Sequence, residues 1–368
     1  MTALRVGFDT GPLYGPKSGI GFAVQHLHDA LAAQPGIELL DYLVSFRARP
    51  APPAVRLPMP AAVAVRCWAH GRRPRVDRWL KGAALVHGTN YVVPPSHLPR
   101  LVSVYDCWFL RHPEAARPAV RRAGAVLRRA VADGAVVHTS SHATEAAVRE
   151  LLPGAAVRTV HLAALPLPAP PTMAPIAELA GRPFVVAIGT LEKRKNLPVL
   201  VRAFGLLAEQ HPEVSLVLAG ADGDDRVAIH EAVDALGPRV SNRVMFAGRI
   251  DESARSWLLH HAAVLAYPSL DEGFGFPLLD AMQASVPVVA STAGSIPEVA
   301  GDAALLCAPD DVQGLAANLG LALDSLSVRA HLVATGTQRW RQFSWARCAA
   351  EMAELYHLVA AGDVAALR

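Results

Sequence analysis

One stretch in the second half of the chain, residues 262–287, most constrains the fold. The apolar run Ala262–Tyr267 has the length of a buried strand, and Pro268 ends it. The glycine turn Gly273–Gly275 follows. Pro277 then stands where the first turn of a helix tolerates proline, because the missing N–H has no partner there. The stretch therefore predicts a strand, a glycine turn and a helix start in direct succession.

This strand–turn–helix unit is suited to binding an anion. Its glycines let a ligand approach the backbone closely, and a helix start directs free N–H groups and a partial positive charge toward it. Glu272 stands just before the turn, and Asp280 is expected in the first helical turn, so a carboxylate flanks each side. A phosphate attached to a molecule rich in hydroxyl groups, such as a nucleotide sugar, fits this combination.

Short apolar runs alternate with helical patterns over most of the chain. Runs of strand length include Leu4–Asp9, Phe184–Ile188 and Val214–Ala219, and a loop and a helix pattern follow each of them. Repeated β-α units with buried strands predict parallel sheets covered by helices on both faces. We therefore expect an α/β protein with two Rossmann-like halves.

A proline-rich segment predicts the boundary between these halves. The chain has 368 residues, which is too long for one ordinary core. Residues 165–183 are rich in proline and contain little that can pack. We expect an N-terminal domain over residues 1–165, a linker over 166–183 and a C-terminal domain over 184–345.

Charge is distributed unequally along the chain. Residues 1–182 hold 21 Lys and Arg against 11 Asp and Glu, whereas residues 183–368 hold 14 against 21. The basic side chains gather over Arg66–Lys81, with tryptophans among them, and over Arg117–Arg129. Such a surface fits anionic lipid headgroups, and an ordinary solvated helix face explains it equally well. Nucleic acid is the weaker hypothesis, because no recognised nucleic-acid module accompanies the charge.

The sequence lacks the signature motifs of several functional classes. The four cysteines form neither a C-x-x-C pair nor a zinc spacing, and the sequence contains no H-E-x-x-H, nucleophile elbow or P-loop. The N-terminal segment MTALRVGFDT runs directly into a strand pattern without the layout of a signal peptide. No window reaches the ~18 apolar residues of a membrane span. We therefore expect a cytoplasmic protein.

The first half has its own candidate residues at strand ends. The loop after the first strand contains Gly19 and Gly21, but it lacks the third glycine and the position of a dinucleotide fingerprint, so no NAD site is expected. His87, Asp106 and Ser140 lie at the ends of apolar runs. Open α/β sheets bind ligands at the carboxyl ends of their strands, so we expect these three side chains to share a cleft. Each alone is more often structural.

Cations are expected near the glycine turn of the second half. Arg194 and Lys195 follow the strand pattern Phe184–Ile188, and they can hold phosphate oxygens, arginine as a fork and lysine as a point charge. Glu272 and Asp280 are eight residues apart, and the turn between them could aim both inward. A metal pair is the rival use of two carboxylates, but the nearby cations already provide the positive charge that a diphosphate needs.

These motifs resemble the retaining GT-B glycosyltransferases of family 4 (glycosyl transferases group 1), in particular the bacterial mannosyl- and rhamnosyltransferase-like group that builds surface polysaccharides. The resemblance extends over nearly the whole chain and is most specific at residues 268–291, PSLDEGFGFPLLDAMQASVPVVAS. The other matching segments are DTGPLYGPKSGIG, HGTNYVVPP, VYDCWFLRHPE, IGTLEKRKNLPVLVRAF, FAGRI, SIPEVAGDAALL and FSW. The resemblance implies two Rossmann-like domains facing a central cleft, and a C-terminal helix, about 346–368, that crosses back to the first domain.

The resemblance also implies roles for the matching positions. Glu272 would bind hydroxyls of the donor sugar, and Asp280 stands where the family usually has a glutamate that holds the ribose. Arg194 and Lys195 would stabilise the departing diphosphate. The catalytic residues expected on this basis are Glu272, Arg194, Lys195, Asp106 and Tyr105. The residues expected to bind the donor are Gly19, Gly21, Gly189, Arg249, Ile250, Gly273, Phe274, Gly275, Phe276 and Asp280.

Three positions depart from the family pattern. Asp280 is shorter than glutamate by one methylene, about 1.5 Å of reach, and the loss of one charge-assisted hydrogen bond costs roughly 1.5–3 kcal/mol. Tyr105 replaces a histidine and is a poor proton acceptor near neutral pH. Thr190 stands where many relatives have an arginine. These changes leave open a different donor, slower chemistry or lost activity.

The main hypothesis is a cytoplasmic glycosyltransferase, peripheral on the inner face of the plasma membrane. It would move a hexose or deoxyhexose, of the mannose or rhamnose type, from a nucleotide-diphosphate sugar to a saccharide or lipid-linked acceptor in polysaccharide or glycoconjugate biosynthesis. The resemblance implies that no metal or other cofactor is required. The alternative is a non-catalytic subunit that binds a partner transferase, and the motifs do not favour a sugar-nucleotide epimerase.

Overall fold

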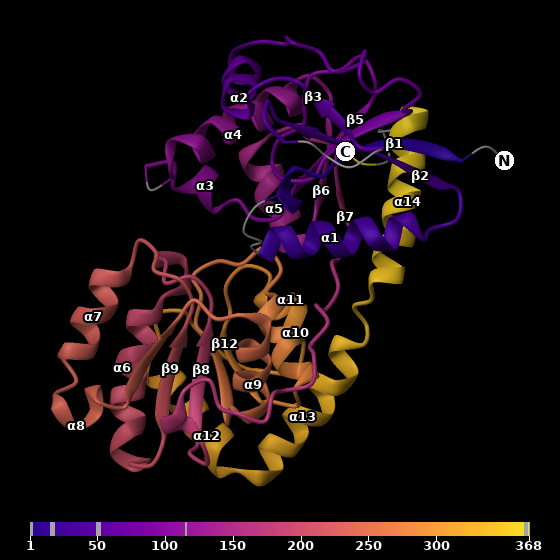
Figure 1. The fold of residues 1–368 in the computed structure, drawn as a ribbon. Helices are drawn as coiled ribbons and strands as arrows, with labels where there is room; N and C mark the ends of the chain where they lie inside the picture. The colour runs from indigo at the N-terminus through magenta and orange to yellow at the C-terminus, as the bar shows by residue number, and fades with distance from the viewer. Residues whose placement is uncertain (1–2, 15–18, 49–52, 115, 364–366, 368) are drawn as a thin grey trace. The chain divides into compact units, whose positions relative to one another are not determined.

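The computed structural model describes residues 3–14, 19–48, 53–114, 116–363 and 367. It divides into two compact units, which are coloured by chain position in Figure 1. Unit 1 comprises Met1–Ala163 and Phe343–Arg368, and unit 2 comprises Ala164–Gln342. Each unit is an α/β domain with its own parallel sheet. The segment expected to be a linker, residues 166–183, belongs entirely to unit 2.

Unit 1 is built on a sheet whose described residues form seven parallel strands in the order β3-β2-β1-β4-β5-β6-β7. The strands are β1 (Leu4–Asp9), β2 (Ile37–Val44), β3 (Val55–Leu57), β4 (Leu85–Gly88), β5 (Arg100–Val104), β6 (Val136–Thr139) and β7 (Val157–Thr159). β1 pairs with β2 on one side and β4 on the other. The strand order therefore reverses between β1 and β4, and such a switch point is where open α/β sheets bind ligands.

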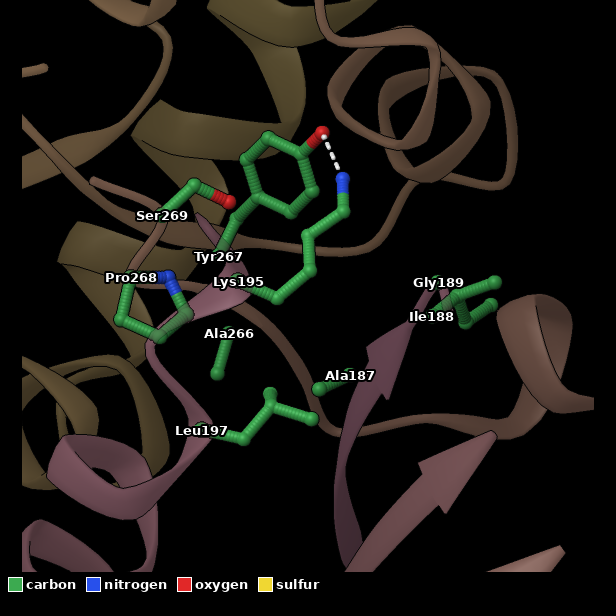
Figure 2. A pocket seen from close by; sticks show the side chains of 9 residues that line it. All are labelled: Ala187, Ile188, Gly189, Lys195, Leu197, Ala266, Tyr267, Pro268 and Ser269. Carbon is green, nitrogen blue, oxygen red and sulfur yellow. Dashed lines mark hydrogen bonds between the residues drawn. The ribbon is translucent and has the colours of Figure 1, made fainter. Parts of the chain in front are cut away.

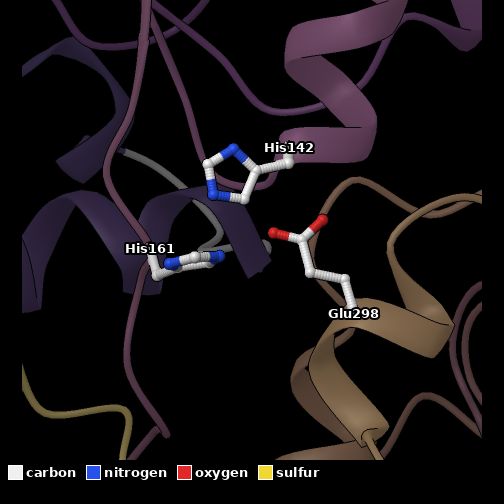
Figure 3. A group of neighbouring side chains, drawn as sticks. All are labelled: His142, His161 and Glu298. Carbon is white, nitrogen blue, oxygen red and sulfur yellow. The ribbon is translucent and has the colours of Figure 1, made fainter.

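The helices of unit 1 include one from the C-terminal end of the chain. The α-helices are α1 (Gly19–Ala32), α2 (Ala61–His70), α3 (Trp108–Arg111), α4 (Pro118–Ala132), α5 (His142–Leu151) and α14 (Trp345–Ala361). α14 packs against α1 and β4, which confirms the expected return of the last helix to the first domain (Figure 1). The ring of His161 lies edge-on to His142 of α5, shown in Figure 3, and to Phe343 at the start of the returning segment.

Unit 2 has six parallel strands in its described residues, in the order β10-β9-β8-β11-β12-β13. They are β8 (Phe184–Ile188), β9 (Ser215–Ala219), β10 (Val244–Gly248), β11 (Val264–Tyr267), β12 (Val288–Ser291) and β13 (Leu305–Cys307). Alternate residues of β8, Phe184 with Val186 and Val185 with Ala187, are buried on opposite faces of the sheet. Both faces are therefore covered, and the switch point of this sheet lies between β8 and β11.

The helices of unit 2 cover its sheet and hold the proline-rich segment. They are α6 (Leu197–Gln210), α7 (Arg226–Asp234), α8 (Pro238–Ser241), α9 (Glu252–His261), α10 (Phe276–Gln283), α11 (Ile296–Ala300), α12 (Val312–Asp324) and α13 (Leu326–Trp340). Ser256 of α9 donates a hydrogen bond to the carbonyl of Pro168, and Gln283 of α10 donates one to the carbonyl of Leu165. The segment is therefore packed on unit 2. None of the helices in the described residues combines the length and apolarity needed to cross a bilayer.

Two local expectations are wrong. The richness of residues 47–62 in Pro, Ala and Arg predicts a loop, but β3 and the start of α2 lie within them, apart from residues 49–52, which fall outside the described part. Asp280 is the fifth residue of α10 and not in its first turn. The helix begins at Phe276, directly after Gly275 in its left-handed conformation, φ 93°, so Asp280 lies beyond the first four helical residues.

Candidate functional site

The expected donor-binding residues of unit 2 all follow the carboxyl ends of parallel strands. Gly189 directly follows β8, and Arg194 and Lys195 lie in a short 3-10 helix, Lys193–Lys195, before α6. Arg249 and Ile250 follow β10, and the stretch 272–276 follows β11. Because all six strands run parallel, these residues lie at one edge of the sheet, with those after β8 and β11 beside the switch point.

Glu272 is the centre of this group, because both of its carboxylate oxygens contact a cation. Oε2 lies 2.6 Å from Nη1 of Arg194, and Oε1 lies 2.6 Å from Nζ of Lys195. The Glu272 side chain is only 6% exposed. The backbone N–H of Leu270 also donates to the carbonyl of Arg194, which fixes the loop after β11 to the loop after β8. The structure thus brings together three of the five residues expected to be catalytic.

The electrostatics of this cluster keep the carboxylate charged. Burial raises the pKa of Glu272, but the neighbouring Lys195 and Arg194 outweigh burial and hold the pKa at about 2. Burial lowers the pKa of Lys195, and Glu272 opposes that effect. Arg194 also pairs with Glu192 at 2.8 Å, so two cations face two carboxylates. An incoming diphosphate would therefore add negative charge to a balanced cluster, and it could bind by sharing the cations with Glu272.

The loop after β12 supports Glu272 from the backbone side. Gly275 precedes α10 as its N-cap, and as a glycine it has no side chain with which to cap the helix start. Gly294, after β12, has φ +54°, and a Cβ there would lie 2.6 Å from the backbone N and O of Glu272. The neighbouring Ser295 N–H donates to that same carbonyl at 3.0 Å. Only glycine fits at position 294. Because it has no side chain, the loop after β12 can approach the Glu272 backbone closely and hold it in place.

A small cavity lies beside the lysine of this cluster. Figure 2 shows Lys195 reaching the ring of Tyr267, where Nζ donates to the hydroxyl at 3.1 Å. The cavity next to them, which Gly189 also lines, has a volume of about 10 Å³. That is the space of roughly one water molecule, so a donor diphosphate would have to approach the cations from outside it.

Asp280 is buried and has a partner that the sequence did not indicate. Its Oδ2 lies 2.5 Å from Nη1 of Arg255 on α9, whereas Oδ1 has no hydrogen-bond partner within the described residues. Arg255 also pairs with Glu252 at 2.8 Å. Burial raises the pKa of Asp280 to about 6, against the opposing effect of Arg255. Asp280 therefore binds Arg255 of α9 through Oδ2, while Oδ1 has no hydrogen-bond partner within the described residues.

In unit 1, His87 does not take the position expected for a cleft residue. It lies inside β4 and is fully buried. Its Nδ1 is 2.8 Å from the hydroxyl of Tyr356 on α14, and its Nε2 is 2.8 Å from Oγ of Ser103. Burial lowers its pKa well below the ordinary value. Ser140 is also fully buried, so both are core residues, and the prediction that they line a cleft is wrong.

Asp106 and Tyr105 follow β5 at the carboxyl edge of the unit 1 sheet. Asp106 accepts hydrogen bonds from the hydroxyl of Tyr91 at 2.9 Å and from the N–H of Trp108 at 3.1 Å, so its side chain organises the start of α3. Burial raises the pKa of Tyr105 far above its ordinary value. The tyrosine is therefore neutral at any physiological pH and could only take part through its neutral hydroxyl.

At the switch point of unit 1, Asp9 is a residue that the sequence analysis passed over. It ends β1, and its Oδ1 accepts the N–H of Gly11 at 2.9 Å. Burial raises the pKa of Asp9 to about 7, and the bond from Gly11 opposes that effect. Gly19 and Gly21 lie in the first turn of α1, while residues 15–18 of the loop between them and β1 fall outside the described residues. The sequence signal that could have identified Asp9 as a candidate site residue was a carboxylate at the end of the first strand, next to a glycine loop.

Comparisons with known proteins agree with this geometry. The sequence profile described as "Glycosyl transferases group 1" matches residues 172–339. Over 183 residues the chain is 35% identical to O-antigen chain mannosyltransferase B of Escherichia coli, which covers 50% of this chain and 48% of that protein. Over 176 residues it is 30% identical to the phosphatidyl-myo-inositol mannosyltransferase of Mycolicibacterium smegmatis, with coverage of 47% and 44%. The matched stretches thus span about half the length of these relatives.

The fold has close counterparts among solved structures. The sucrose-phosphate synthase of Thermosynechococcus elongatus superposes with a TM-score of 0.73 at 20% identity, covering 97% of this chain and 99% of that one. At that identity the likeness shows the fold, and the fold is GT-B. Residues 172–339 are thus similar to the glycosyl transferases group 1 family, and the whole chain has a GT-B architecture of two parallel-sheet domains.

Proposed function

We propose that this protein is a retaining hexosyltransferase that takes a hexose, of the mannose type, from a nucleotide-diphosphate sugar. The acceptor would be a saccharide or a lipid-linked saccharide in the synthesis of a surface polysaccharide or glycolipid. The names of the two relatives, both mannosyltransferases, support mannose and give no support to rhamnose. The basic side chains of unit 1 would favour an acceptor presented at an anionic membrane surface.

The observation that carries the proposal is the cluster of Glu272 with Arg194 and Lys195. Two cations and a carboxylate of fixed geometry converge at the switch point of a parallel sheet, beside the start of α10, whose N-cap is a glycine. Cations and helix-start N–H groups suit a diphosphate. A charged carboxylate accepts hydrogen bonds from sugar hydroxyls and would fix the sugar relative to its leaving group.

In the proposed reaction, the bond between the anomeric carbon and the diphosphate breaks while the acceptor oxygen attacks from the same face. Arg194 and Lys195 would stabilise the negative charge that develops on the departing diphosphate. The departing phosphate oxygen would accept the proton of the acceptor hydroxyl. Glu272 would position the sugar through its hydroxyls. These roles need no added metal, and turnover that persists in EDTA would support them.

Donor binding by the whole chain is the direct test of the proposal. Purified protein is mixed with GDP-mannose, UDP-glucose or dTDP-rhamnose, and thermal unfolding and donor hydrolysis are followed. We expect GDP-mannose or UDP-glucose at about one hundred times its Kd to stabilise the protein by roughly 2.7 kcal/mol. Glu272→Gln should abolish the hydrolysis, whereas Glu231→Gln, an exposed change on α7, should leave it intact.

Two results would contradict the proposal in different ways. If no nucleotide sugar or nucleoside diphosphate raises the unfolding temperature, the cluster does not bind a donor. If a nucleoside diphosphate stabilises the protein but no sugar is released or transferred with any acceptor, the rival hypothesis of a non-catalytic subunit is favoured. Retention of configuration is checked separately, by the anomeric form of the first transferred product in NMR.

A further inference from the structure

Unit 1 contains an open hollow at the amino end of strand β5. It is lined by Arg72, Arg75, Pro95, Ser96, Arg100 and Asp133, and has a volume of about 270 Å³. Arg100 is the first residue of β5, whereas Asp106 follows the last residue of the same strand. The hollow therefore lies at the amino end of the strand, whereas Tyr105 and Asp106 lie at its carboxyl end.

Three arginines line this hollow, and each is held in place by a different contact. Arg72 forms a two-pronged salt bridge to the carboxylate of Asp133, with its Nε 2.9 Å from Oδ2. Nη1 of Arg75 lies 2.6 Å from Nε2 of His97. Nη2 of Arg100 donates to the backbone carbonyl of Asp133 at 2.9 Å. Each guanidinium keeps further N–H groups that have no acceptor within the described residues.

The charges of the hollow do not balance. Three cations line it with a single carboxylate, Asp133, and that carboxylate is bound by Arg72. Arg100 is only 9% exposed, and among the described residues no carboxylate forms a salt bridge with it. Burial lowers the pKa of Arg100, and the charge of Asp133 opposes that effect without cancelling it. An anion bound beside Arg100 would offset the remaining cost of burying the cation.

The size and the donor set of the hollow indicate the chemistry of the ligand. Its volume of about 270 Å³ is far above the roughly 10–15 Å³ that one water needs, yet it is below the ~300–1,000 Å³ typical of sites for larger molecules. Guanidinium groups bind phosphate oxygens in pairs, with planar forks that fit two oxygens. We propose that this hollow binds a phosphate group, held by Arg75 and Arg100 with Arg72 at its rim.

The same phosphate chemistry has two sources, a small phosphorylated molecule and the headgroup of an anionic lipid. The proposal does not depend on the transferase activity, since the hollow is built from residues of unit 1, whereas Glu272 and its cations belong to unit 2. A protein that binds no nucleotide sugar could still bind phosphate in this hollow, and a protein that binds no phosphate here could still bind a nucleotide sugar at Glu272. The two proposals can therefore fail separately.

Calorimetric titration of the full chain with inorganic phosphate, at low ionic strength and constant chloride, tests the proposal. We expect Arg75→Gln and Arg100→Gln each to weaken the Kd about tenfold or more, the equivalent of one lost charge-assisted hydrogen bond. Arg66→Gln, an exposed change on α2 outside the hollow, removes the same charge and should weaken it less than about twofold. Arg75 is exposed, so its variant keeps the test valid even if Arg100→Gln does not fold.

Vesicles distinguish the two sources. Binding to phosphatidic acid vesicles that Arg75→Gln abolishes and inorganic phosphate displaces supports a lipid headgroup. Phosphate binding without vesicle binding supports a small phosphorylated molecule. The proposal is overturned if neither probe binds, or if Arg66→Gln weakens binding as much as Arg75→Gln does, because the surface charge would then act diffusely.

Discussion

Oδ2 of Asp280 lies 2.5 Å from Nη1 of Arg255, and this buried pair ties α10 to α9 within unit 2. Asp280 is the shortened residue at the position expected to face the ribose of the donor. One of its oxygens is thus committed to the protein itself, and only Oδ1 has no partner within the described residues. If Asp280 binds the donor, it would do so through that one oxygen, which agrees with one ribose contact in place of two.

Arg255→Met should destabilise the protein in a pH-dependent way. Removing the cation leaves Asp280 buried without its charged partner, so we expect a loss of about 3 kcal/mol in the free energy of unfolding at pH 7.5. The pKa of Asp280 is already raised to about 6 and would rise further in the variant. A raised carboxyl pKa means that the folded state binds the proton more tightly, so the penalty shrinks below pH 6. Urea unfolding at pH 5 and pH 7.5 measures the difference.

The matched control for this change is Glu252→Gln, which removes the other partner of Arg255. The Glu252 side chain is 51% exposed, and an exposed pair contributes at most about 1 kcal/mol. An Arg255→Met loss that is the same at both pH values would show that packing, and not the charge on Asp280, is responsible.

Lys195→Met should remove most of the transfer activity while Lys193→Met should not. Both lysines lie in the 3-10 helix after β8, but only Lys195 contacts Glu272, and Lys193 is exposed. Loss of one charge that stabilises the leaving diphosphate should lower kcat roughly 10²–10³-fold. Turnover of Lys195→Met within a few-fold of the unchanged protein would remove this lysine from the proposed mechanism.

Asp9→Asn should change how stability depends on pH between about 4 and 7. Burial raises the pKa of Asp9 to about 7, so the folded protein holds this proton where the unfolded chain has lost it. Stability attributable to Asp9 is therefore lost as pH rises through this window, and Asp9→Asn avoids the loss. The variant should gain stability relative to the unchanged protein from pH 4.5 to pH 7.5 in urea unfolding. A constant difference across that range would contradict the raised pKa.

The sequence predicted the strands better than the side-chain partners. Buried parallel strands are continuous apolar runs with polar ends, and Leu4–Asp9 and Phe184–Ile188 match β1 and β8 to the residue. β3 was missed because it is a three-residue edge strand among prolines, too short to show a pattern. His87 was misplaced because an apolar run does not reveal whether its last polar residue is solvated or buried.

The contacts that decide such questions come from distant parts of the chain. His87 is held by Tyr356, which lies 269 residues away. Asp280 is paired with Arg255 from the preceding helix. Motif spacing placed Glu272 near Arg194 because both follow neighbouring strands of one sheet, whereas no motif links α10 to α9. The partners of His87 and Asp280 are determined by packing between elements, and local sequence patterns do not encode that packing.

Gly294→Ala should destabilise unit 2 more than Gly248→Ala. Both glycines have positive φ, +54° and +63°, so both substitutions introduce backbone strain of about 1 kcal/mol or more. A Cβ at position 248 meets nothing within 4 Å, whereas one at 294 lies 2.6 Å from the backbone of Glu272. We expect about 1–3 kcal/mol of additional loss for Gly294→Ala, since the backbone has to move to relieve the overlap.

The same substitution should also weaken the proposed donor site, because the loop after β12 holds the Glu272 carbonyl through the N–H of Ser295. Displacing that backbone would shift the carboxylate relative to Arg194 and Lys195. Urea unfolding compares the two alanine variants, and calorimetric titration with a nucleoside diphosphate follows the site in Gly294→Ala. If Gly294→Ala matches Gly248→Ala in stability and binds the nucleotide as tightly as the unchanged protein, the contact with Glu272 does not support the site.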